Sequence, residues 1–220
     1  DNTPIEVLDY VKGEDVTEKD GKIMIKNKSN NWTIQHGVPK KIEVSNEFAY
    51  FLGLYVSEGS TYEHSISITN NNKNLLDIAK RFYKSIGVNS DTNINKSSLR
   101  VYSPALVKFL HSVCGDPDKN IKGKGRLCYT KKIPNFVFGW GKERIGAFLR
   151  GCFDGDGTVG NQVSYCTTSK MLAGGMLKLL EVLGIGFYIR SDTDAYKIQI
   201  PLNDLIKFKD MVGFEDKSKD

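Results

Sequence analysis

The sequence is poor in the residues that build metal centres and disulfide frameworks. Its 220 residues include only four cysteines and three histidines, and no two cysteines have CxxC spacing. We therefore expect reduced thiols rather than zinc ligands or disulfides, and the histidines are too scattered for a metal-binding triad. The residues concerned are Cys114, Cys128, Cys152, Cys166, His36, His64 and His111.

Long apolar runs are also missing. No stretch is long and apolar enough to cross a membrane, and no secretory signal peptide is evident. We therefore expect an intracellular protein (cytoplasmic, nucleoid or organellar) that is not secreted and has no membrane partner. The hydrophobic content of 40% is sufficient at this length for one core or for two small fused halves.

What the sequence does contain is a duplicated motif. Residues 51–59 read FLGLYVSEG and residues 149–157 read LRGCFDGDG, and the two closing glycines lie 98 residues apart. Each run is mostly apolar and ends in an acid followed by glycine. Two unrelated core helices with polar ends would have no reason to match at these positions, so we interpret the runs as equivalent helices of a pseudo-symmetric pair.

Small residues lie four positions apart in each run and therefore share one helix face. They predict that the two helices pack side by side at backbone distance, as small residues allow in membrane helices. The closing glycines predict a left-handed residue at the end of each helix. The small residues are Gly53, Ser57, Gly151 and Gly155, and the closing glycines are Gly59 and Gly157.

The acids of the two motifs, Glu58 and Asp156, are expected at the C-terminal ends of their helices. The helix macrodipole is negative there, so it disfavours a carboxylate. An acid at this position in both repeats predicts a bound cation. If the helices pack side by side, the two carboxylates meet at one pole and could hold divalent metal.

These two runs resemble the paired dodecapeptide motifs of the LAGLIDADG homing endonucleases, and the second is most similar to the intein-encoded members. The resemblance covers residues 45–220 and implies that Glu58 and Asp156 occupy the metal-binding acid positions. The first motif departs from the family pattern at Val56, where many members carry Asp, and at Glu58, where most carry Asp. The resemblance implies a monomeric endonuclease that uses two or three Mg²⁺ ions to make double-strand breaks in a long DNA target.

The ends of the chain bear on its origin. It begins at Asp1 without methionine, and it lacks the leading Cys or Ser and the closing His-Asn of a splicing intein. We therefore expect a piece that is excised from, or embedded in, a longer intein- or intron-encoded precursor and does not splice by itself.

The duplication continues beyond the motifs. In each half a short alternating segment is followed by an apolar helix pattern and then by a second, polar alternating segment, which indicates an α+β fold. These segments are residues 65–69, 74–86 and 98–102 in the first half and 163–167, 171–183 and 196–200 in the second.

The resemblance implies an αββαββα unit for each half. The two units would pack through the motif helices, and their antiparallel sheets would form a saddle over DNA. We expect an N-terminal extension over residues 1–44, a first endonuclease repeat over 45–134 and a second over 135–220.

Alternation within the strands predicts which side chains face DNA. Residues such as Ile66 and Val101 should point to the core, and their neighbours should point away. Any antiparallel sheet with one solvated face alternates in this way, so the pattern alone does not establish base contacts. The outward candidates are Ser65, Ser67, Thr69, Ser98, Arg100, Tyr102, Ser164, Cys166, Arg190, Asp192, Lys197 and Gln199.

Basic residues gather between the two halves. Residues 116–144 carry eight Lys or Arg against three acids, which accounts for the net charge of +5. Lys122, Lys124 and Arg126 lie in a glycine-containing loop that is either a solvated linker or a contact for DNA phosphates.

A metal nuclease also needs a cation that stabilises charge near the phosphate. Lys131 and Lys132 precede Ile-Pro, and this segment resembles the lysine-bearing segment of the family. Lys131 fits best by spacing, with Lys132 next, and both are candidate catalytic residues. The repeat predicts a partner near Lys217 or Lys219.

The first 44 residues match nothing in this pattern. Residues 22–25 and 32–34 are strand-like and are separated by Asn- and Ser-rich turns. The segment is either an additional DNA-contact module or the remnant of a host segment.

The sequence as a whole predicts a site-specific, Mg²⁺-dependent DNA endonuclease that acts as a monomer on double-stranded DNA. The alternative is a cleavage-deficient DNA-binding regulator or an RNA-splicing maturase on the same scaffold. The presence of both motif acids favours the endonuclease.

Overall fold

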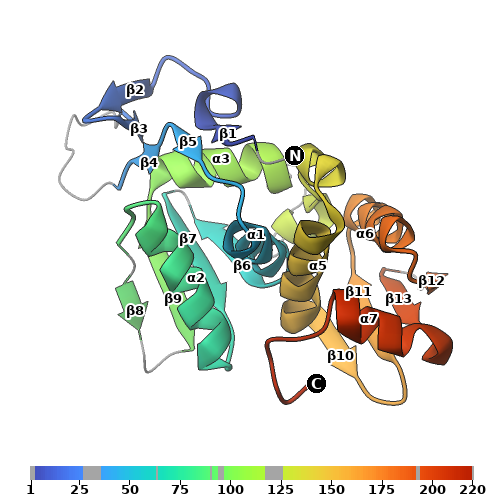
Figure 1. The fold of residues 1–220 in the computed structure, drawn as a ribbon. Helices are drawn as coiled ribbons and strands as arrows, with labels where there is room; N and C mark the ends of the chain where they lie inside the picture. The colour runs from blue at the N-terminus through green and yellow to red at the C-terminus, as the bar shows by residue number, and fades with distance from the viewer. Residues whose placement is uncertain are drawn as a thin grey trace.

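The computed structural model describes residues 3–26, 36–62, 64–89, 91–93, 97–116, 126–191 and 194–219. Two helices occupy its centre, and each is followed by a four-stranded antiparallel sheet (Figure 1). These central helices are α1 (Asn46–Glu58) and α5 (Lys142–Asp156), and they contain the two predicted motifs.

The two halves have the same order of elements, as the duplication predicts. After α1 come β6 (Gly59–Tyr62), β7 (Ser65–Thr69), α2 (Lys73–Ser85), β8 (Asp91–Asn93), β9 (Ser98–Tyr102) and α3 (Pro104–Cys114). After α5 come β10 (Gly157–Val159), β11 (Val163–Thr167), α6 (Lys170–Leu183), β12 (Tyr188–Ser191), β13 (Tyr196–Ile200), the 3-10 helix η4 (Leu202–Asp204) and α7 (Leu205–Met211). The strand orders are β6-β7-β9-β8 and β10-β11-β13-β12, so the fold consists of two αββαββα repeats.

Between the repeats the chain forms α4 (Arg126–Thr130) and the 3-10 helix η3 (Asn135–Gly139). Serine side chains cap α1 and α3. Ser45 accepts from the Phe48 amide at 3.1 Å at the start of α1, and Ser103 accepts from the Leu106 amide at 3.3 Å at the start of α3. Such caps satisfy amides that the first helical turn leaves without a partner.

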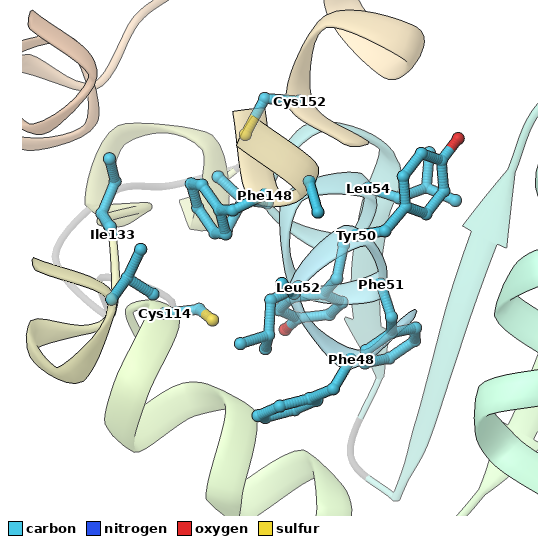
Figure 2. Packing of buried hydrophobic residues seen from close by; sticks show 14 of the residues in the cluster. Phe48, Tyr50, Phe51, Leu52, Leu54, Cys114, Ile133, Phe148 and Cys152 are labelled. Carbon is cyan, nitrogen blue, oxygen red and sulfur yellow. The ribbon is translucent and has the colours of Figure 1, made fainter. Parts of the chain in front are cut away.

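The helices α1 and α5 touch at their backbones, as the small residues predict. A Cβ atom built on Gly53 would overlap the Phe148 carbonyl oxygen, and one on Gly151 would overlap that of Tyr50. Larger side chains on either side of this contact join one hydrophobic core (Figure 2). The labelled members of this cluster are Phe48, Tyr50, Phe51, Leu52, Leu54, Cys114, Ile133, Phe148 and Cys152.

The prediction for the closing glycines was wrong. Gly59 has φ −71° and ψ 137°, and Gly157 has φ −76° and ψ 147°, so neither is left-handed. Each helix turns directly into a strand, and a Cβ on either glycine would overlap the carbonyl oxygen of Tyr55 or Phe153. Glycine is needed there for lack of space rather than for its backbone angles.

The N-terminal residues form two small sheets over α3 (Figure 1). They comprise β1 (Ile5–Glu6), the 3-10 helix η1 (Val7–Asp9), β2 (Val16–Lys19), β3 (Lys22–Ile25), β4 (Val38–Pro39) and β5 (Lys41–Ile42), which pair as β1-β5 and β2-β3-β4. Tyr10 packs edge-on against Phe109 with ring centres 5.8 Å apart, and Asp15 accepts from Lys108 at 2.8 Å. The predicted strand at 22–25 is confirmed, and that at 32–34 lies outside the described residues.

Among the described helices, none combines the length and apolar character needed to cross a membrane. All four cysteines are free thiols.

A single methyl group tests the helix contact. Gly151→Ala should lower the free energy of unfolding, because its Cβ meets backbone atoms of α1 and such overpacking typically costs about 1–3 kcal/mol. Gly174→Ala is the matched control in α6, where a Cβ would meet no atom within 4 Å. It should stabilise the protein by roughly 0.5–1 kcal/mol through helix propensity. Denaturant unfolding of the two variants measures both effects, and equal stability of the two would contradict the close contact.

Candidate metal centre and DNA-facing surfaces

The two motif acids meet where α1 and α5 end. Glu58 is the last residue of α1 and Asp156 is the last residue of α5. Gly155 lies against the other helix, since a Cβ built on it would be 2.5 Å from the Ser57 Cβ and 3.0 Å from the Glu58 Cγ. The pair of C-terminal ends, which we call the acidic pole, therefore carries one carboxylate from each repeat.

Burial raises the pKa of both acids. For half-buried Glu58, desolvation raises the pKa and the charge of Asp156 adds to it, while a hydrogen bond from Asn70 opposes the shift. Asn70 Nδ2 donates to Glu58 Oε1 at 2.8 Å. Asp156 keeps access to solvent, yet the protein packed around its carboxylate raises its pKa, against the effect of Lys131 and Lys219. A divalent cation would relieve the repulsion between the two carboxylates.

Lys131 lies at the acidic pole, as predicted. Its side chain is buried, with 8% of its surface exposed, and its Nζ donates to the Ser57 carbonyl oxygen at 2.7 Å. Desolvation lowers its pKa, and the nearby Asp156 and Glu58 oppose that shift. The ammonium is therefore held beside the last turn of α1, close to both acids.

The side chain of the neighbouring Lys132, the second candidate, points elsewhere. Its amide donates to the Cys114 carbonyl at 2.8 Å, and its side chain lines a groove of about 380 Å³ with Phe138 and Met171. Lys131 instead lines a hollow of about 240 Å³ with Asp156. Residues 131–134 belong to no helix or strand, and the two neighbouring lysines line different hollows.

Lys219 is the counterpart of Lys131 in the second repeat. Its Nζ donates to the carbonyl oxygens of Asp154 and Gly157, each at 2.7 Å, and to that of Phe153 at 3.2 Å. The other candidate, Lys217, is exposed. The two ammonium groups rest on the C-terminal turns of the two motif helices, and the charge of each lowers the pKa of both acids.

The outer faces of the two sheets carry most of the predicted DNA-facing side chains. In the second sheet, Cys166, Lys197 and Arg190 are cross-strand neighbours, and all three are exposed. In the first, Arg100 is exposed and lies 5.2 Å from the centre of the Tyr62 ring. Thr69 is exposed, whereas Ser98, Tyr102 and Gln199 are partly buried. The predicted core residues Ile66, Ile68, Leu99 and Val101 are buried.

Three serines predicted on this surface are buried: Ser65, Ser67 and Ser164 are 8%, 5% and 4% exposed. They lie on the central strands β7 and β11, where larger neighbours cover a short side chain. Ser67 is paired with Arg100, and Ser164 lies 2.8 Å from the Thr158 hydroxyl.

Lys122, Lys124 and Asp192 lie outside the described residues, and Arg126 opens α4 with only its backbone described.

Sequence reasoning overlooked two polar residues near the pole. Asn70 follows β7 and binds Glu58. Asp154 is 1% exposed and accepts from the Tyr50 hydroxyl at 2.8 Å. Asp154 is visible as an acid in the second motif. The residues that bind it are distant in sequence, so no local pattern reveals the contact.

Known proteins resemble this chain over both repeats. A LAGLIDADG-like domain model matches residues 45–113 and 143–216, which is more than half of the chain. The DNA-directed RNA polymerase subunit Rpo1C of Methanocaldococcus jannaschii is 30% identical over 98% of this chain and 24% of that protein. A DNA polymerase of Thermococcus hydrothermalis is 26% identical over 77% of this chain and 10% of the polymerase. The chain thus spans a quarter or less of the length of these relatives.

A solved structure has the same fold. The structure of I-DmoI in complex with DNA and Mn superposes with a TM-score of 0.55 and 20% sequence identity, covering 76% of this chain and 96% of that one. I-DmoI is a homing endonuclease. The family match over both motif helices and both sheets shows that this chain belongs to the LAGLIDADG family.

Proposed function

We propose that this chain is a site-specific endonuclease that hydrolyses phosphodiester bonds in both strands of a DNA duplex. The observation that carries the proposal is the acidic pole, where two repeats each contribute one carboxylate and one anchored lysine. A pseudo-symmetric centre of this kind suits a substrate with two antiparallel strands. I-DmoI, which shares the fold, has been crystallised with DNA and Mn.

The donor set fits a hard divalent cation such as Mg²⁺. Glu58 and Asp156 offer carboxylate oxygens, and within the described residues no group of three His, Cys, Asp or Glu side chains is arranged to hold a metal. Mg²⁺ in proteins is commonly held by one or two carboxylates, with water and substrate phosphates as the remaining ligands. We infer that Glu58 and Asp156 would together hold two or three such ions.

The bound metal would lower the pKa of the attacking water and neutralise charge on the leaving oxygen. The residues of the chain do the positioning. The Lys131 ammonium is fixed at the C-terminal end of α1 and the Lys219 ammonium at that of α5. Each can stabilise negative charge that develops on a phosphate. Ser57 holds the helix ends together, because its hydroxyl donates to the Cys152 carbonyl at 2.9 Å.

The outer faces of the two sheets would hold the DNA. Arg100, Arg190 and Lys197 can bind phosphate or guanine, and Gln199 can pair with adenine. The N-terminal sheets add no excess of basic residues, so we assign most of the affinity to the two repeats.

The relatives support an embedded origin. The matching segment occupies 24% of an RNA polymerase subunit and 10% of a DNA polymerase, two proteins of different function. A segment shared by such proteins is expected of an insert, and we propose that this chain belongs to an intein-type precursor.

The acids should be needed for cutting and should destabilise the metal-free protein. Because their pKa values are raised, the folded state binds more protons than the unfolded state just above the usual carboxyl range, so stability falls as pH rises through that range. Glu58→Gln or Asp156→Asn should therefore raise the Tm in EDTA at pH 7, reduce the stabilisation by added Mg²⁺, and abolish double-strand cleavage while DNA binding persists.

Thermal melts and cleavage assays with and without Mg²⁺ measure these effects. The control is Glu181→Gln, which replaces an exposed acid on α6. It should change neither the Tm nor the cleavage rate. Wild-type cutting by either pole variant would contradict the assignment, and it would leave a DNA-binding regulator or maturase as the better description.

Lys131 should act on the reaction more than on affinity. Loss of one electrostatic contact to a developing charge typically costs about 10²–10³ in rate, so Lys131→Met should slow single-turnover cleavage by about that factor with little change in the DNA Kd. Lys132→Met is the matched control and should cut normally. Normal cutting by Lys131→Met would remove this lysine from the catalytic centre.

Basic residues on the sheet faces should set the salt dependence of DNA binding. Each phosphate contact contributes about −0.9 to the slope of log K against log salt, so Arg190→Ala and Lys197→Ala should each make the slope shallower by about that amount. Lys178→Ala removes the same charge from α6, on the other side of the second sheet, and should leave the slope unchanged. An equal effect of all three variants would mean that the sheet face is not the DNA-binding surface.

A further inference from the structure

Asp154 is the second acid of the second motif, and its carboxylate is fully engaged within the protein. Its Oδ2 accepts from the Tyr50 hydroxyl at 2.8 Å and from the Glu215 amide at 3.0 Å. Its Oδ1 accepts from the Asp216 amide at 3.1 Å. Both oxygens accept bonds inside the protein, and only 1% of the residue is exposed, so Asp154 is not open to a ligand at the acidic pole, although it lies only two residues from Asp156.

The amides bound by Asp154 belong to the segment that carries Lys219. Residues 212–219 contain no helix or strand. Asp216 Oδ1 accepts from the Ser218 amide at 3.0 Å, and the Lys219 amide donates to the Asp216 carbonyl at 2.8 Å. The segment is therefore fixed to Asp154 at residues 215 and 216 and folded on itself from Asp216 to Lys219. The Lys219 side chain then reaches the last turn of α5.

The first repeat positions its lysine by another route. The equivalent of Asp154 is Val56, which is completely buried and apolar. Lys131 follows helix α4, and the amide after it is bound by the Cys114 carbonyl at the end of α3. Backbone contacts between helices therefore hold Lys131, and position 56 needs no acceptor. This difference gives a physical reason for the unequal residues at equivalent positions of the two motifs.

We propose that Asp154 is a positioning residue that docks residues 215–219 on α5 and thereby places the Lys219 ammonium beside Asp156. The role in cleavage rests on the proposed endonuclease function, whereas the docking does not. Tyr50 belongs to α1, so its hydrogen bond to Asp154 couples this docking to the contact between the repeats. A second tether runs from Arg150, whose guanidinium lies 3.2 Å from Glu215. That ion pair is on the surface, and such pairs contribute little on their own.

The first test reads the docking without reference to cleavage. Asp154→Asn retains one acceptor oxygen but turns an amide group toward donors. Hydrogen exchange at the Glu215 and Asp216 amides should accelerate by about tenfold or more, since local opening removes their protection. Tyr50→Phe removes one donor and keeps the ring, so it should give a smaller acceleration. Lys217→Met, in the same segment, should leave exchange unchanged. Unchanged exchange in Asp154→Asn would overturn the proposal.

The second test separates positioning from general destabilisation. Lys219→Met should slow single-turnover cleavage by about 10²–10³, and Asp154→Asn should slow it in the same direction with unchanged DNA affinity. In the double variant, Asp154→Asn should add no further loss, because the lysine that it positions is already gone. Rates that multiply in the double variant would assign Asp154 a purely structural role and overturn the proposal.

A further readout concerns the strand that is cut. Lys131 and Lys219 sit on different helix ends, so Lys219→Met and Asp154→Asn should leave nicks in the same strand of a plasmid target, and Lys131→Met in the other. Opposite strand bias for Lys219→Met and Asp154→Asn would contradict the positioning role. If the wild-type chain cuts no DNA, the endonuclease assignment fails while the exchange measurement still decides whether Asp154 docks the segment.

Discussion

Direct backbone contact between α1 and α5 determines where every other functional group can lie. No side chain separates the two helices at Gly53 and Gly151, because a Cβ at either position would overlap the opposite main chain. The helices therefore end close together. The first strand of each sheet, β6 or β10, begins at that shared end. Ser57 and Gly155 continue the contact to the last turn, so the two motif acids lie at adjacent helix ends.

This arrangement has an electrostatic cost that a stable scaffold alone would avoid. Two carboxylates stand at the negative ends of two helix dipoles, and burial raises the pKa of both. Two ammonium groups offset the charge in part, and each is anchored to main-chain carbonyls of the helix end that it approaches. Local destabilisation that a bound ligand can relieve is typical of functional sites.

Much of this could be predicted from the sequence because the duplicated pattern fixes both the elements and their mutual relation. The strands at 65–69, 98–102, 163–167 and 196–200 have the predicted bounds, and the small residues identified the helix contact. A repeat also allowed Lys219 to be anticipated as one of two lysines. The LAGLIDADG resemblance was needed to connect these features to DNA.

The failures concern quantities that depend on distant neighbours. The sequence pattern places Ser67 on the outer face of its sheet, but the bulk of adjacent strands decides its exposure. Gly59 looks like a left-handed helix end, and only the space beside Tyr55 shows why glycine is present. The direction of Lys132 depends on a backbone bond to Cys114. The role of Asp154 was overlooked because its partners, Tyr50 and the amides of residues 215–216, are distant in sequence.

The central claim is that the acidic pole cuts both strands of a specific DNA sequence with the help of divalent metal. The most direct measurement is to incubate the chain with a library of genomic DNA fragments and Mg²⁺ and to sequence the ends that form. The account predicts ends that recur at one related set of long target sequences, with a break in each strand, and no such ends in EDTA. Ends scattered over unrelated sequences, or the same ends in EDTA, would contradict it.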